Sequence, residues 1–170
     1  SWRYRRMLEL LGSKPTFTAG DHWAFMRDTK NPMAARIGPL MSAALRGQAG
    51  TRAAGEVLAA REHRDEPGAA APAIFQSVYR HFARRVFEDD LGPELTARYL
   101  GSYYLWHERL ALLLEDPGSD WFDDRRTPGR ETRDDVFRLA ALDALAELQP
   151  VLGQDVRHWE WGKVHTVTFF

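Results

Sequence analysis

Apolar residues recur at helical spacing through most of the chain. Ile74, Val78, Phe82 and Val86 lie four residues apart and predict the buried stripe of a helix over 73–90. Comparable spacing of apolar residues predicts further helices over 2–11, 19–29, 33–45, 53–61 and 93–113, and one that begins after Thr132 and is ended by Pro150 and Gly153. The pattern therefore predicts a mainly α-helical protein.

Two helix starts carry a capping box. Thr18 precedes Asp21 by three residues, and Thr132 precedes Asp135 by three. In this arrangement the two side chains satisfy free backbone N–H groups at the first turn of a helix. We therefore expect helices to begin directly after Thr18 and Thr132.

Other positions predict interruptions. Pro39 is expected to kink or break the helix over 33–45 because proline lacks a backbone N–H, and Gly92-Pro93 should separate two helices. The segment 46–72 is rich in glycine, alanine and charge, which predicts a loop region with a flexible tip and one short helix.

The spacing of apolar residues changes from helical to alternating in the last seven residues. In 164–170, His165, Val167 and Phe169 alternate with polar and apolar neighbours, which predicts a β-strand. A lone strand leaves its backbone groups without partners. The sequence thus predicts a single helical unit over 1–170 with one C-terminal strand, a fragment of a longer polypeptide.

Composition excludes several classes of protein. The 170 residues carry a net charge of −1 and no cysteine, which excludes a disulfide scaffold, a cysteine nucleophile and a thiolate zinc site. No apolar run is long enough to span a membrane. Arg3, Arg5 and Arg6 form a basic group without a matching stripe elsewhere, so we expect neither a nucleic acid nor a membrane partner.

Candidate catalytic and metal-binding residues form no recognised motif. The histidines, among them His81 and His107, lack metal-ligand spacing, and the acidic loop over 116–124 lacks the pattern of a calcium loop. No serine lies in a GxSxG turn. Ser1 could act as an N-terminal nucleophile, but the residues after it read as an amphipathic helix, so we do not assign it that role.

Three segments, taken in order, resemble the penicillin acylase (penicillin amidase) family. They are WRYRRMLELLGSKPTFTAGDHW at 2–23, LLLEDPGSDWFDDRRTPGRETRDDVFRLAALDALAELQPVLGQD at 112–155, and RHWEWGKVHTVTFF at 157–170. The resemblance covers nearly all of the chain and is weakest at 46–72. The last segment contains a Trp-x-Trp-Gly-x-x-His pattern, which is the most specific of the three. The chain departs from the family pattern at Met26, where many relatives have Gln, and near Arg61, where a Trp is expected.

The resemblance implies an N-terminal-nucleophile hydrolase with an αββα sandwich, of which this chain would be a helical segment of the β-chain. Such enzymes hydrolyse amides of acylated small molecules, for example β-lactams and acyl-homoserine lactones. Arg3 matches the family's active-site arginine, whereas the nucleophile and the oxyanion-hole Asn fall outside these residues. The fragment by itself is therefore expected to be inactive.

The same resemblance implies partners and a location. The partners would be the rest of the β-chain and the α-chain, together with a small acyl-amide substrate. No cofactor is expected within the segment, since the calcium ligands of the family also fall outside it. Export to the periplasm or secretion is implied as well.

One alternative remains open at this stage. The chain could be a non-enzymatic helical interaction module that happens to carry the tryptophan pattern. For Trp159 and Trp161 we expect a structural role, because extended geometry points both rings to the same side, where Leu145 and Leu148 can cover them. Gly162 should permit a close approach of another chain segment.

Overall fold

The fold was described from a computed structural model, which describes residues 1–60, 62–102 and 105–168. In these ranges the chain forms seven α-helices and three short 3-10 turns. The helices are α1 (Trp2–Leu11), α2 (Ala19–Met26), α3 (Pro32–Arg46), α4 (Arg52–Ala59), α5 (Ala70–Leu100), α6 (Leu105–Leu113) and α7 (Arg133–Leu152). The 3-10 turns are η1 (Asp120–Phe122), η2 (Val156–His158) and η3 (Trp161–Lys163).

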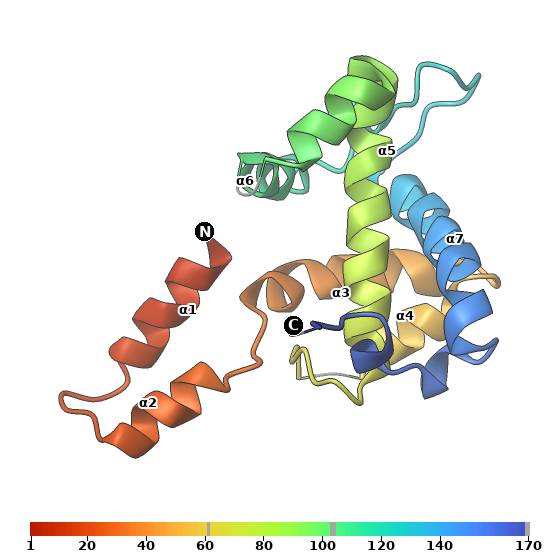
Figure 1. The fold of residues 1–170 in the computed structure, drawn as a ribbon. Coiled ribbons are helices and arrows are strands. Elements are labelled where there is room, and N and C mark those ends of the chain that lie inside the picture. Colours follow the sequence, from red (N-terminus) through yellow and green to blue (C-terminus); the bar gives the residue numbers. More distant parts are fainter. Residues whose placement is uncertain (61, 103–104, 169–170) are drawn as a thin grey trace.

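The body of the molecule is built around α5. Figure 1 shows α5 running through the middle, with α7 alongside it and α3 crossing it. Phe82 of α5 stacks on Phe137 of α7 with ring centroids 4.1 Å apart, and both rings are fully buried. Close ring packing of this kind adds to the large apolar area that each phenyl group removes from water. The predicted apolar stripe of 73–90 therefore faces the core.

The capping boxes form as the sequence predicts. The Thr18 and Thr132 hydroxyls accept the backbone N–H groups of Asp21 and Asp135, and both aspartates reach back to the cap residue. The helix after Thr18 ends at Met26 rather than at 29. Short-range signals thus set the helix starts more accurately than the helix ends.

Gly92 and Pro39 behave differently from each other. Gly92 has non-helical dihedral angles, φ +74° and ψ 163°, and divides α5 as predicted. Pro39 lies inside α3 without ending it, so the predicted break is absent. The helix predicted over 93–113 is also wrong, because α5 ends at Leu100 and α6 begins at Leu105.

The segment 46–72 contains the short helix that the sequence predicts, and α5 begins at Ala70, before the end of the predicted loop region. The short helix predicted there is α4, and it packs closely on α3: a Cβ atom on Gly55 would lie 2.9 Å from the backbone N of Arg46. The buried hydroxyls of Ser42 and Thr51 tie the two helices together, at 2.8 Å from the carbonyl oxygen of Gly55 and 2.7 Å from that of Leu45. Small residues in α4 permit its close packing on α3.

The predicted C-terminal strand is absent from 164–168. The N–H groups of Val164 and His165 both donate to the carbonyl oxygen of Trp161, at 3.1 and 3.0 Å, and close a turn. No β-strand occurs in the described ranges, so this segment has no neighbouring strand to pair with. Residues 169–170 of the prediction lie outside the described residues.

Candidate functional site

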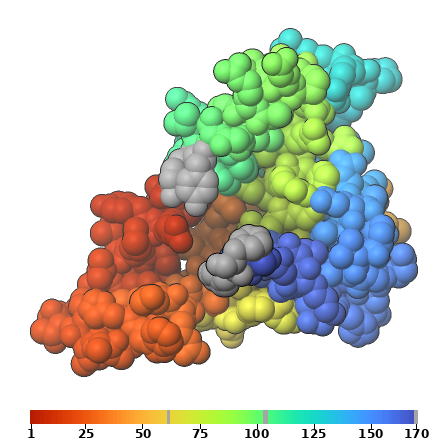
Figure 2. Space-filling view, viewed as in Figure 1, coloured from red at the N-terminus to blue at the C-terminus, as the bar shows by residue number. Residues whose placement is uncertain are grey.

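A groove of about 1210 Å³ lies between the α1–α2 pair and the body. Figure 2 shows α1 and α2, in red and orange, as a lobe beside the rest of the molecule. One wall comes from α1, α2 and the linker 28–32, and the other from α5, α6, α7 and the segment around η3. The lining includes Arg3, Arg6 and Asp28 on the first wall and Tyr79, Trp106, His107, Glu147 and Trp161 on the second.

Arg3 is exposed and lines this groove from the first turn of α1. Within the described ranges it has neither a hydrogen bond nor an ion pair, whereas Arg6, one turn further, is paired with Asp28. The Ser1 hydroxyl accepts the N–H of Tyr4 and so caps the helix that carries Arg3. A guanidinium that faces an open groove without a protein partner is available to a polar ligand.

The opposite wall contains a stack of aromatic rings. Tyr79 stacks on Phe75, Trp106 and His107 at centroid distances of 5.9, 5.5 and 5.7 Å. The Tyr79 hydroxyl lies 3.4 Å from Nδ1 of His107. Burial raises the pKa of Tyr79 and lowers the pKa of His107, the latter against the opposing charge of Glu108. Both rings are therefore neutral at physiological pH, and this wall presents aromatic faces with one polar edge.

A second polar group on this wall is centred on Glu147. Its carboxylate accepts hydrogen bonds from Arg80 at 2.5 and 2.6 Å and lies 2.6 Å from Nε2 of His81. The Ser77 hydroxyl donates to it at 3.5 Å. Burial acts to raise the pKa of Glu147, but the bonds from Arg80 and His81 outweigh burial and lower it. The carboxylate is thus ionised and held by partners, which favours a role in joining α5 to α7.

The two tryptophans of the Trp-x-Trp-Gly pattern differ in environment. Trp159 is buried, and its Nε1 donates to the carbonyl oxygen of Gly153 at 2.7 Å, as a structural role requires. Trp161 is half-buried, lines the groove and stacks on His165 at 4.6 Å. The burial of Trp159 agrees with the expected structural role. Trp161 packs against the core and also lines the groove, so a structural role for Trp161 stays a prediction. Gly162 does permit a close approach, since its N–H donates to the carbonyl oxygen of Pro67 at 2.8 Å.

The hydroxyl and acidic groups of the described part of the chain were compared with the usual catalytic and metal-binding arrangements by their contacts. There, no serine or threonine hydroxyl is hydrogen-bonded to a histidine. Over the same residues, no three His, Asp or Glu side chains gather as metal ligands would, and none of the helices is long and apolar enough to cross a membrane. The groove offers surfaces for binding and orienting a ligand.

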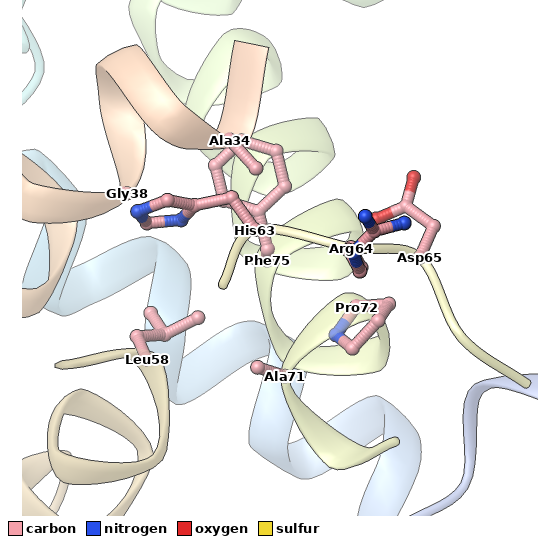
Figure 3. Close-up of a pocket in the computed structure, with 9 residues that line it drawn as sticks. All are labelled: Ala34, Gly38, Leu58, His63, Arg64, Asp65, Ala71, Pro72 and Phe75. Atoms are coloured by element: carbon pink, nitrogen blue, oxygen red, sulfur yellow. The ribbon is translucent and has the colours of Figure 1, made fainter. Parts of the chain in front are cut away.

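A separate small cavity lies beneath the loop at 63–65 (Figure 3). It measures about 20 Å³ and is bordered by the His63 ring, which lies against Gly38, and by Phe75. A space of this size holds about one water molecule. It is too small to receive a substrate, so the groove remains the candidate site.

Sequence reasoning named Arg3 but did not find the facing wall. Tyr79 and Trp106 lie on helices that the sequence alone does not bring together, and Glu147 sits on a third. Their spacing in the sequence is typical of ordinary core or surface residues of a helix. No short-range signal identifies them, because the groove exists only through tertiary packing.

Comparisons with known proteins agree with the resemblance. A family model described as penicillin amidase matches residues 1–170. The chain is 32% identical over 114 residues to the acyl-homoserine lactone acylase QuiP of Pseudomonas putida, which covers 64% of this chain and 14% of that protein. It is 30% identical over 98 residues to QuiP of Pseudomonas aeruginosa, covering 55% of this chain and 12% of that protein. The chain therefore spans a small part of the length of these relatives.

Proposed function

The chain belongs to the penicillin amidase family, and on that premise we propose that it forms a helical wall of the substrate cleft in an amide hydrolase. The enzyme would remove acyl groups from acylated small molecules, with β-lactams and acyl-homoserine lactones as the substrate classes. The similarity to acylases named for acyl-homoserine lactones supports the second class.

The observation that carries this proposal is the unpaired Arg3 in the groove. By resemblance Arg3 matches the active-site arginine of the family, and in the structure it lines the groove. Arginine keeps its charge and offers a planar set of N–H donors, which suits the orientation of a carbonyl or carboxylate near a nucleophile. We assign Arg3 to substrate orientation.

The proposal includes the remainder of the enzyme. The nucleophile and oxyanion hole would come from other parts of the β-chain and from the α-chain, within the αββα sandwich of the family. The 170 residues by themselves would then hydrolyse nothing, since they hold no group that stabilises the tetrahedral intermediate. Export to the periplasm or secretion completes the proposal and is tested by fractionating cells that express the full-length protein.

Substitution of Arg3 in the full-length protein tests the assignment. We expect Arg3→Ala to lower kcat/KM for N-acyl-homoserine lactones or phenylacetyl amides by about 100-fold, the typical cost of losing one positioned donor. Arg27→Ala is the matched control, because Arg27 is exposed and lies over Trp23 outside the groove. Equal activity of the Arg3 and Arg27 variants would refute the role of Arg3.

A further inference from the structure

The position of Arg3 depends on a helix that is attached to the body with little apolar packing. Neither α1 nor α2 contains a buried residue, whereas each of the other α-helices contains at least three. On α1, Met7, Leu8 and Leu11 are exposed by about half. Trp2 at the start of α1 packs against the core, but the rest of the helix buries little apolar surface, so a polar contact further along α1 is also needed to fix its orientation.

A two-pronged ion pair supplies that contact. The Arg6 guanidinium donates from Nε and Nη2 to the two carboxylate oxygens of Asp28, at 2.7 and 3.0 Å. The two side chains are only 19% and 12% exposed. The hydrogen bond from Arg6 lowers the pKa of Asp28 against the effect of burial. Such bidentate pairs fix geometry as well as charge.

Asp28 is itself held by the body. It lies in the linker between α2 and α3, where the N–H of Asn31 donates to the carbonyl oxygen of His63 at 2.8 Å. The N–H of Asp65 donates to the carbonyl oxygen of Thr29, also at 2.8 Å. The linker is thus bound on both sides of Lys30 to the loop that leads into α5.

Arg3 and Arg6 are three residues apart on α1, so they lie on neighbouring parts of one helix face, and both line the groove. The order of contacts runs from the loop at 63–65 to the linker, from Asp28 to Arg6, and along α1 to Arg3. We propose that Asp28, acting through Arg6, is a positioning residue that sets Arg3 against the substrate. This inference rests on the proposed function and adds to it the two residues, Asp28 and Arg6, that orient Arg3.

The chain offers a matched control for this ion pair. Arg85 on α5 donates from Nε and Nη2 to the two carboxylate oxygens of Asp143 on α7, at 2.6 and 3.0 Å. The donor atoms are the same as in the Arg6–Asp28 pair and the distances are nearly so, but the control pair is more exposed, at 34% and 36%, and does not line the groove. Removing either carboxylate costs one bidentate ion pair, and only the loss of Asp28 should displace Arg3.

The experiment is a double-mutant cycle in the full-length enzyme. We expect Asp28→Asn to lower kcat by about 10- to 100-fold, as a displacement of about 1 Å can do, while Asp143→Asn leaves kcat unchanged. In an Arg3→Ala background, Asp28→Asn should have no further effect on kcat. Thermal unfolding of each variant is measured alongside.

The outcomes separate this inference from the proposed function. If Arg3→Ala retains full activity, the proposed role of Arg3 fails. If Arg3→Ala is impaired but Asp28→Asn is either fully active or equally harmful with and without Arg3, the positioning role of Asp28 is overturned. If Asp28→Asn fails to fold, Asp28→Glu, which keeps the charge, is measured in its place. Any loss of kcat that it causes should likewise disappear in the Arg3→Ala background, and an equal loss in both backgrounds would overturn the positioning role.

Discussion

Truncation of Trp159 tests how the C-terminal segment is held to the body. Trp159 is 2% exposed, and its indole N–H donates to the carbonyl oxygen of Gly153 at 2.7 Å. Trp159→Ala removes the buried ring, which typically costs about 3–5 kcal/mol. Trp159→Phe keeps most of the apolar area and loses the hydrogen bond, so about 1–2 kcal/mol is expected.

Trp161→Ala is the internal comparison for this prediction. The Trp161 ring is half-buried, and its closest ring contact is His165 at 4.6 Å. Since less area leaves water, we expect a loss of about 1–2 kcal/mol. In a chain of this size 1 kcal/mol corresponds to about 2–4 °C in Tm, so Trp159→Ala should lower Tm by roughly 10 °C.

Urea and thermal unfolding followed by far-ultraviolet circular dichroism is the suitable assay, because the substitutions themselves alter tryptophan fluorescence. The free energies are compared at the same pH and salt concentration. An equal loss of stability in Trp159→Ala and Trp161→Ala would contradict the burial argument. So would a Trp159→Phe variant as unstable as Trp159→Ala.

Three further substitutions have measurable outcomes in the same unfolding assay. Gly55→Ala should destabilise by about 1–3 kcal/mol, because its Cβ would lie 2.9 Å from the backbone N of Arg46; unchanged stability would disprove close α3–α4 packing. Gly92→Ala should cost about 1–3 kcal/mol, because φ +74° with ψ 163° suits glycine almost exclusively; a gain in stability would contradict this. Thr132→Ala should cost about 1 kcal/mol. Because the hydrogen bond with Thr132 lowers the pKa of Asp135, that stabilisation is present above the ordinary carboxyl pKa and lost as pH falls through the folded value. The variant should therefore lose less stability than the parent on acidification, and identical acid profiles would argue against the cap.

The sequence analysis is correct where an element depends on residues close together in the sequence, and wrong where it depends on distant ones. The helix starts after Thr18 and Thr132 and the division at Gly92 depend on residues within one turn of each other, and all three occur as predicted. The strand over 164–168 fails because pairing needs a neighbouring strand, which the described residues do not contain. Alternation of side chains predicts a strand only where such a partner exists.

The segment 46–72 shows a different limit. Glycine and alanine are typical both of mobile loops and of helices that pack at short distance, and composition does not distinguish the two. The sequence predicts the short helix α4 but not its close packing on α3, to which the buried hydroxyl of Thr51 contributes by donating to the carbonyl oxygen of Leu45. Such a contact depends on tertiary placement, so it is visible in the structure and not in the pattern of residues.

The candidate site depends both on a local sequence segment and on contacts between distant parts of the chain. Arg3 could be named from the sequence because it lies in a segment that resembles a family with a known arginine, and this inference needed no geometry. The groove that gives Arg3 a role needs the Arg6–Asp28 ion pair across 22 residues and the wall around Tyr79, which belongs to a helix that begins near residue 70. Tertiary contacts thus decide whether the arginine faces a ligand or solvent, and substitution of Asp28 probes that step without altering Arg3 itself.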